Sequence, residues 1–218
     1  MHKITSLFIC CSGFFWLDGF SQPKMVKPDL SVKVNFQTVN RTISLSIDEN
    51  KSATVHLDAR PNSGVAWISN VNFTIGTIEF DVKGKDLPQQ SFVGLAFHRV
   101  DDSTYDAIYF RPFNFQAADT ARKSHGVQYI SLPKYDWSVL REKFPNKYEH
   151  QLMTRVDPNG WFHASIVVSK ESIKVYVNKE EKPSLVVQPI TDHLYGKLGF
   201  WVGNGSEGSF SNLVVRSE

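Results

Sequence analysis

The sequence predicts an all-β protein in which two antiparallel sheets pack face to face. About eleven to thirteen short apolar or alternating segments are separated by turn-forming residues, which is the pattern of such a sandwich. A convincing helical pattern is confined to one segment, whereas a parallel sheet needs a crossover, usually a helix, between successive strands. The expected fold class is therefore an antiparallel two-sheet jelly-roll sandwich with one short helix.

The expected strands are short and are bounded by Gly, Pro, Asn or Asp. In the segment 77–83, Ile78, Phe80 and Val82 share one face, and charged residues occupy the other. The expected strands, in chain order, are Thr42–Ile47, Ala53–Asp58, Val65–Ile68, Gly76–Lys83, Phe92–Val100, Tyr105–Arg111, Val127–Leu132, Trp161–Ser169, Ser172–Asn178, Leu185–Gln188, Lys197–Val202 and Ser209–Arg216.

The expected helix lies in the middle of the chain. Asp136 can cap it, Trp137, Leu140 and Phe144 recur at helical spacing, and Pro145 ends it. A stripe of this kind is typical of a short helix that packs on a core.

The N-terminal residues 1–21 have the pattern of a secretory signal peptide, with cleavage expected before Gln22. Lys3 precedes the apolar run Ile4–Leu17, and small residues stand at Gly19 and Ser21. A membrane anchor is the alternative, but the apolar run is shorter than the ~20 residues that span a bilayer. The protein is therefore expected to be secreted or periplasmic. The leader is expected to be followed by a linker and edge strand over residues 22–41 and by one jelly-roll domain over residues 42–218.

Both cysteines of the chain, Cys10 and Cys11, lie in this leader, so the mature domain is expected to contain no disulfide and no cysteine metal site. Lipidation of the leader remains an alternative to its cleavage. The net charge is close to neutral at +2, with no cluster of Lys and Arg, which argues against a nucleic-acid partner. No later run is long and apolar enough to span a membrane.

Aromatic residues make up 13% of the chain, which suits a large core and also suits the stacking of sugar rings. The central hairpin carries the first candidate surface. Tyr105, Tyr109 and Arg111 fall on one face of its second strand, and Ile108 and Phe110 fall on the other. If the apolar face meets the core, the Tyr and Arg face is left for a cleft.

The C-terminal third shows a recognisable order of short motifs: Trp161-Phe-His163, Val175-Tyr-Val-Asn178, Gly196-Lys-Leu-Gly-Phe-Trp201 and Gly208-Ser-Phe-Ser-Asn-Leu-Val-Val215. This order resembles the closing half of a concanavalin A-like lectin/glucanase domain, the jelly roll shared with laminin-G-like modules. Within that superfamily, the chain is similar to exported bacterial domains grouped with the 3-keto-disaccharide hydrolases. The resemblance implies a sheet topology and a glycan or glycoside as partner, but no particular reaction.

Glu79 and Asp81 are candidate catalytic carboxylates, because they lie two residues apart on one strand face. The laminarinase-like hydrolases of this fold carry a further glutamate after such a pair, whereas Val82, Lys83 and Gly84 follow here. The acid that should protonate a leaving group is missing, so the plainer interpretation is that both carboxylates face solvent. His125, in the polar loop Pro112–Gly126, is the third weak candidate.

A set of aromatic and polar residues is expected to converge on the concave sheet or its rim, where rings stack on sugars and amides or guanidinium groups bind hydroxyls. Its members are Tyr105, Tyr109, Arg111, Asn114, Gln128, Tyr129 and Trp201. His98 and His163 could be general bases, although a lone histidine on a strand is usually structural. No metal or cofactor is expected, and only a structural calcium ion is left open.

Three functions remain open from the sequence. The first is an exported carbohydrate-active domain that binds a glycan on its concave face. The second is a glycoside hydrolase or a 3-keto-glycoside hydrolase or lyase. The third is a structural or adhesion module. Oligomeric state and the identity of the sugar have no signature in the chain.

Overall fold

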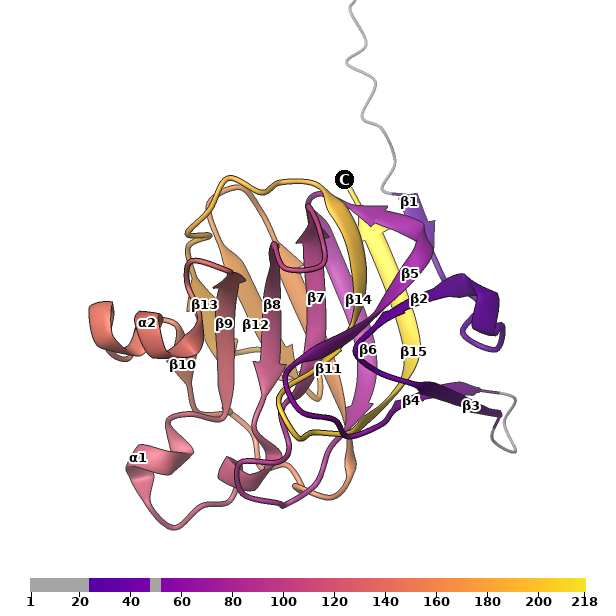
Figure 1. Cartoon of the computed structure of the whole chain (residues 1–218). Coiled ribbons are helices and arrows are strands. Elements are labelled where there is room, and N and C mark those ends of the chain that lie inside the picture. The colour runs from indigo at the N-terminus through magenta and orange to yellow at the C-terminus, as the bar shows by residue number, and fades with distance from the viewer. Residues whose placement is uncertain (1–23, 48–51) are drawn as a thin grey trace, which may run out of the picture.

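The computed structural model describes residues 24–47 and 52–218, and these form two antiparallel sheets that pack face to face (Figure 1). The predicted two-sheet jelly-roll sandwich is confirmed. The expected signal peptide, residues 1–21, and the expected turn Asp48–Lys51 lie outside the described residues.

Eight strands form the sheet at the back of Figure 1. In spatial order they are β13 (Leu185–Val187), β12 (Ile173–Val177), β11 (Trp161–Val168), β6 (Gly76–Lys83), β15 (Gly208–Ser217), β4 (Ala53–Leu57) and β3 (Ile43–Ile47), and β1 (Lys24–Val26) pairs with the end of β15. The segment expected as a linker therefore contributes a strand to this sheet.

Seven strands form the other sheet. In spatial order they are β10 (Glu149–His150), β9 (Val127–Leu132), β8 (Tyr105–Phe110), β7 (Val93–Arg99), β14 (Gly196–Val202), β5 (Gly64–Phe73) and β2 (Phe36–Val39). β5 is longer than the predicted strand Val65–Ile68, because its pairing with β14 resumes after a bulge.

Two α-helices are present among the described residues, which corrects the expectation of one. The predicted helix is α2 (Trp137–Lys143), whose first backbone N–H donates to the Asp136 carboxylate. The additional helix, α1 (Thr120–Lys123), lies in the polar loop and is capped by Asp119, with the short 3-10 turn η2 (Pro112–Asn114) before it. A second 3-10 turn, η1 (Lys33–Asn35), precedes β2. α1 is one turn long and buries no residue, so it leaves no apolar period in the sequence.

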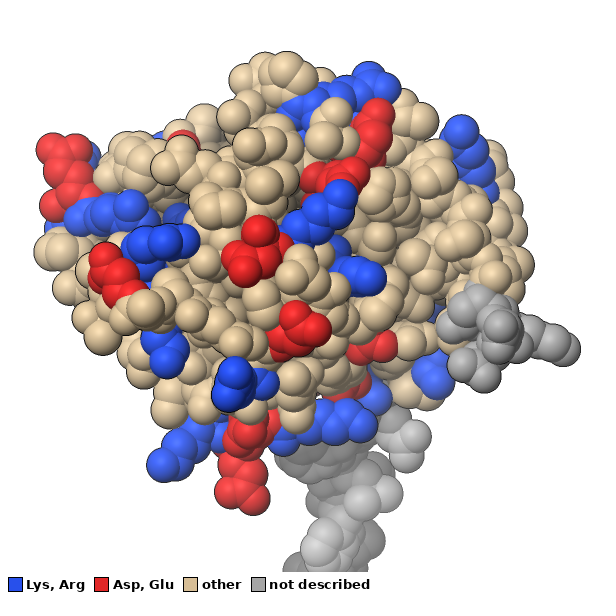
Figure 2. Space-filling model, turned by 90° about the horizontal axis from the view of Figure 1, so that it is seen from below, with Lys and Arg blue, Asp and Glu red and all other residues tan. Residues whose placement is uncertain are grey.

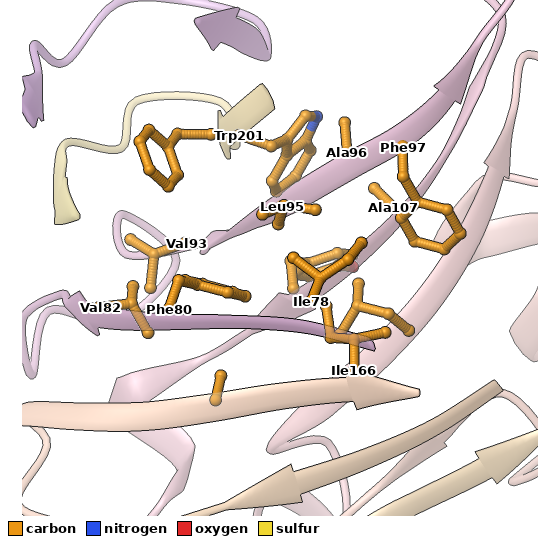
Figure 3. Close-up of a cluster of buried hydrophobic side chains, with 14 of the residues drawn as sticks. Ile78, Phe80, Val82, Val93, Leu95, Ala96, Phe97, Ala107, Ile166 and Trp201 are labelled. Carbon is orange, nitrogen blue, oxygen red and sulfur yellow. The ribbon is translucent and has the colours of Figure 1, made fainter. Parts of the chain in front are cut away.

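Aromatic rings from both sheets fill the space between them. Phe80 on β6, Phe200 on β14 and Phe210 on β15 are fully buried, and the rings of Phe200 and Phe210 stack with 4.6 Å between centroids. Figure 3 shows Ile78 and Phe80 beneath β7, with Trp201 on the opposite side of that strand. The packed core therefore fixes which face of the seven-stranded sheet is left outside.

Within the described residues, no helix combines the length and the apolar character needed to cross a membrane. The same residues contain no group of three or more His, Cys, Asp or Glu side chains that could hold a metal ion.

Candidate functional site

The candidate site lies on the outer face of the seven-stranded sheet, the face turned away from the eight-stranded sheet. Strand register places Tyr109 beside Gly94 and Gln128, and Gly94 beside Trp201, so these side chains form a row across β9, β8, β7 and β14. Phe110, the next residue along β8, points the other way and contacts Phe162 of the opposite sheet at 5.0 Å between ring centroids. The structure therefore places Tyr109 on the outer face, as predicted.

The aromatic residues of this face pack on one another. Tyr109 and Trp201 have ring centroids 4.9 Å apart, Trp67 and Tyr105 have centroids 5.3 Å apart, and the Trp201 indole N–H donates to the Tyr105 hydroxyl at 3.2 Å. Each of these four side chains belongs to a residue no more than 5% exposed. The aromatic side chains of this face therefore fill most of the space where a cleft was expected.

Gly94 makes this packing feasible. A Cβ atom at this position would lie 2.1 Å from the carbonyl oxygen of Ile108 and 2.5 Å from the Cα of Tyr109. The close approach of β7 to β8 needs glycine here, because any side chain would push the strand that carries Tyr109 away.

Arg111 continues the row at the end of β8 and is 5% exposed. Its guanidinium donates to the Tyr109 hydroxyl at 2.8 Å, to the Gln128 amide oxygen through a very short contact, and to the His125 carbonyl at 3.1 Å. It also lies over the Phe92 and Tyr109 rings, 5.8 and 4.9 Å from their centroids. Burial raises the pKa of Tyr109 to about 12, so its phenol stays protonated and donates to Gln128 at 3.1 Å.

Glu149 on β10 gathers the charged groups beside this row. Arg141 donates to both of its carboxylate oxygens, at 2.8 and 2.6 Å, and Arg111 lies 3.5 Å away. Burial raises the pKa of Glu149, but the hydrogen bond from Arg141 and the charges of Arg111, Arg141 and His125 outweigh it, so the net pKa is lowered. Glu149 is therefore an ionised, fully partnered carboxylate.

His125 lies beside the same carboxylate. Its Nδ1 is 2.8 Å from a Glu149 oxygen, an ion-pair distance, although Nδ1 does not point at that oxygen well enough for a directed hydrogen bond. Burial is the main reason that the pKa of His125 is lowered, and the charges of Arg141 and Arg111 act in the same direction against that of Glu149. The imidazole is therefore neutral at neutral pH.

The accessible part of the site is its edge at α2. The Trp137 side chain lies under the Arg141 guanidinium, 5.1 Å from ring centroid to Cζ, and Trp137 is 44% exposed. The side chains of Arg141 and His125 are 38% and 24% exposed. A ligand can therefore meet an exposed ring, a guanidinium and an imidazole at the edge of the buried row.

Asn114 on η2 joins the site through the loop. Its amide donates to the His125 carbonyl at 3.3 Å, the same oxygen that Arg111 binds. Its Oδ1 accepts a hydrogen bond from none of the described residues although the residue is only 4% exposed. A buried acceptor without a protein donor is a position where an ordered internal water molecule can donate a hydrogen bond.

Tyr129 does not belong to this face, which corrects its expected place in the set. It pairs with Ile108 on β8 and points into the sandwich, where its hydroxyl donates to Asp106 at 3.0 Å. Asp106 also contacts His98 at 3.1 Å, and all three residues are buried. The physical reason is alternation, because Tyr129 follows Gln128 on β9 and adjacent residues of a strand face opposite ways.

Glu79 and Asp81 lie on the outer face of the other sheet. The Asp81 carboxylate accepts one hydrogen bond from the Asn212 amide at 2.7 Å and contacts His163 Nδ1 at 2.7 Å, and Glu79 pairs with Arg216. Burial raises the pKa of Asp81, but the His163 and Asn212 hydrogen bonds outweigh it and leave the pKa lowered. These carboxylates are thus not brought together with His125 or with the tyrosine row.

Sequence reasoning missed Glu149, Arg141, Trp137 and Trp67. Trp137 and Arg141 are four residues apart on α2, so helical spacing could have placed them side by side. Glu149 left no signal, because β10 is two residues long and its partner β9 had to be known first.

The chemistry of the face favours binding over carboxylate hydrolysis. Glu149 is the one carboxylate that the described strands of the seven-stranded sheet place on this face. Glycoside hydrolysis ordinarily uses a pair of carboxyl groups, one of them protonated, and Glu149 has a lowered pKa. Rings, guanidinium groups and amides around a shielded face are the groups that orient a polar, ring-shaped ligand.

No protein-family model matches the chain, and no curated protein matches it. Among solved structures, the chain is similar to the carbohydrate binding module CBM66 from Bacillus subtilis, with a TM-score of 0.57, 14% identity, and coverage of 82% of this chain and 93% of that one. It is also similar to the Bacillus licheniformis beta-glucanase, with a TM-score of 0.54, 12% identity, and coverage of 92% and 100%.

The exoplasmic/lumenal domain of VIP36, in a form bound to Ca2+ and Man3GlcNAc, is similar with a TM-score of 0.53, 12% identity, and coverage of 89% of each chain. At these identities the likeness concerns the fold. The chain has the concanavalin A-like jelly roll that the sequence motifs indicated.

Proposed function

We propose that the protein is an exported carbohydrate-active domain that binds a glycan or glycoside on the outer face of the seven-stranded sheet. The observation that carries the proposal is the buried Arg111–Glu149 pair, which Arg141 joins to the exposed edge. Burying ions is costly, and apolar residues usually stabilise a fold as well or better, so a network of this kind is weak evidence for a purely structural role. On the proposed function, the network holds donors in place for ligand hydroxyls.

The proposed ligand enters at the α2 edge and stacks on Trp137. Tyr109, Arg111 and Gln128 form the floor. Tyr105 and Trp201 support the floor by packing and hydrogen bonding with each other. The folds of CBM66 and of the VIP36 domain, a module named for carbohydrate binding and a domain bound to Man3GlcNAc, support a saccharide ligand by analogy of fold.

Two exposed tryptophans provide a matched test. Trp137, at the α2 edge, is 44% exposed and Trp161, on the other sheet, is 46% exposed. A glycan array identifies a ligand, and calorimetry then compares Trp137→Ala with Trp161→Ala. We expect Trp137→Ala to weaken binding about tenfold, equivalent to about 1.4 kcal/mol, and Trp161→Ala to leave it unchanged.

Arg111→Lys tests the floor, because lysine keeps the charge but cannot reach Tyr109, Gln128 and the His125 carbonyl together. Weaker binding with an unchanged fold supports the proposal. Absence of saccharide binding by the intact protein, or equal binding by the Trp137→Ala, Arg111→Lys and parent proteins, would contradict it.

An enzyme that acts on glycosides is the second candidate, and the His125–Glu149 pair favours it. A neutral imidazole 2.8 Å from an ionised carboxylate has the composition of a general base with an orienting partner. A turnover assay on glucosides and 3-keto-glucosides decides the point. Loss of turnover in His125→Ala, with turnover retained in Glu79→Gln, would support an enzyme that uses the His125–Glu149 pair. Absence of turnover by the parent protein would contradict the enzyme hypothesis.

A further inference from the structure

Two adjoining pockets lie outside the sheet face, where the loop that contains η2 and α1 meets the segments that follow β10. The larger has a volume of about 460 Å³ and is called the loop pocket here. Its lining residues are Phe115, Gln116, Lys123, Gln151, Leu152, Met153, Thr154 and Arg155. The smaller, of about 340 Å³, shares Gln116 and adds Arg122 and Asp86. The loop pocket has the volume of a site for a small ligand.

The cations of these pockets have no acidic partner among the described residues. Ion pairs of the described chain involve the arginines Arg60, Arg99, Arg111, Arg141 and Arg216 and the lysine Lys85. Lys123 and Arg155 of the loop pocket and Arg122 of its neighbour are not among them. No lining residue of the loop pocket is acidic. Figure 2, seen from below Figure 1, shows a face on which Lys and Arg are interspersed with Asp and Glu, so this face as a whole carries no single-sign charge.

The polar groups of the loop pocket are held in place by hydrogen bonds. The Gln116 side chain donates to the Val156 carbonyl at 2.8 Å and accepts from Arg155 at 3.3 Å. One bond from the guanidinium to an amide leaves most of its donors free. Arg155 is thus oriented without being neutralised, in the pocket that Lys123 also lines.

The loop pocket and the proposed glycan site are built by the same two chain segments. Lys123 is two residues from His125, and Gln151 is two residues from Glu149. These segments pack closely, because a Cβ at Gly126 would lie 3.4 Å from the His150 carbonyl oxygen and from the Leu152 amide. A saccharide held at the α2 edge can therefore extend toward the pocket along the loop.

We infer that the ligand is an acidic saccharide, and that the loop pocket takes its anionic group, the carboxylate of a uronic acid or a sulfate ester. This inference names the substrate class of the proposed function and rests on it. An arginine fork and a lysine without carboxylate partners attract an anion and bind it with charge-assisted hydrogen bonds, which a neutral sugar cannot supply. A neutral glycan would leave both cations with water as their partner.

Calorimetry on the intact protein tests this inference with three probes of equal length: an oligogalacturonate, a sulfated galactan oligosaccharide and an uncharged oligosaccharide. We expect at least one acidic probe to bind about tenfold more tightly than the uncharged one, and high salt to remove most of the difference. The preferred acidic probe distinguishes a carboxylate from a sulfate. Equal affinity for charged and uncharged probes would overturn the inference.

Substitutions locate the anionic group. Lys123→Gln combined with Arg155→Gln should weaken acidic binding about tenfold and leave uncharged binding unchanged. Lys170→Gln combined with Lys182→Gln, two exposed lysines in turns of the eight-stranded sheet, is the matched control for lost charge.

The same titrations separate this inference from the proposed function. Loss only in Trp137→Ala and Arg111→Lys would overturn the loop pocket and leave glycan binding at the sheet face standing. Loss only in the Lys123 and Arg155 substitutions would support the pocket and overturn the sheet face. Binding by none of the probes would overturn the inference.

Discussion

The outer faces of the two sheets differ in the residues they carry and in how far those residues are exposed. On the seven-stranded sheet, outward residues such as Tyr109 and Trp201 are 2% and 5% exposed and pack on each other. On the eight-stranded sheet, the outward residues of β6 and β11 are mostly polar and at least partly exposed, as in the Asp81–His163 pair. Alternation along a strand decides the face of a side chain, but neighbouring strands decide whether that face is open.

The two carboxylates at these faces make the same contrast. Glu149 has 3% of its side chain exposed and is contacted by Arg111, Arg141 and His125. Asp81 has 27% exposed and is contacted by His163 and Asn212. Water cannot replace the partners of the buried Glu149 carboxylate, so we expect these contacts to stabilise the fold more than the contacts of Asp81 do.

The largest expected difference is between two tryptophans. Trp201→Ala should lower the free energy of unfolding by about 3–5 kcal/mol, because it leaves a cavity beside Tyr109 and removes the hydrogen bond to Tyr105. Trp161→Ala should cost less than about 1 kcal/mol, because its ring is 46% exposed. Denaturant unfolding measures both, and similar losses would show that the outer face of the seven-stranded sheet is not packed as described.

The carboxylates provide the next test. Glu149→Gln should cost about 3 kcal/mol, because the 5% exposed Arg111 loses its carboxylate partner. Asp81→Asn should cost about 1 kcal/mol or less, because water can solvate His163 and Asn212. The same unfolding experiment compares the pair, and a smaller loss for Glu149→Gln than for Asp81→Asn would contradict the contrast.

The smallest expected effect is a pH dependence from His125. Its pKa is lowered in the folded chain from the value of 6.5, so the unfolded chain binds more protons between the two pKa values, and stability falls as pH drops below about 6.5. Glu149, whose pKa is lowered from 4.5, adds a loss of the same sign at more acidic pH. His125→Gln should reduce the slope of the unfolding free energy against pH just below pH 6.5. The reduction should correspond to less than about one bound proton.

His56, on the face of the eight-stranded sheet, has a pKa lowered mainly by burial and contributes with the same sign. The His125→Gln protein should therefore keep part of the slope. Unfolding midpoints measured across the acid range check this, and an unchanged slope in His125→Gln would show that the imidazole is not buried beside Glu149.

Much of the fold follows from local pattern. Alternation of apolar residues in segments such as Ile78–Val82 and Val175–Val177 predicted strands that the structure confirms. The Asp136 cap and the stripe Trp137 to Phe144 predicted α2. These signals are short-range, because strand and helix periods are visible within one segment of chain.

The site depended on contacts between segments distant in the sequence. Alternation correctly put Tyr109 and Ile108 on opposite faces, and applied to Gln128 and Tyr129 it would have separated those two as well. It did not reveal that Trp67 joins Trp201 on the outer face, that the aromatic rings fill this face, or that Glu149 contacts Arg111, Arg141 and His125.

The sequence by itself therefore determined most of the strands, their apolar faces and the two-sheet class, since each depends on the spacing of residues within a segment. Only the tertiary structure decided that the outer face of the seven-stranded sheet is closed by its own aromatic rings and that its accessible edge lies at α2. Strand order and register set those contacts, and they join residues as distant as Tyr105 and Trp201. The loop pocket arises in the same way, because Lys123 and Arg155 meet only when the loop and the segment after β10 pack together.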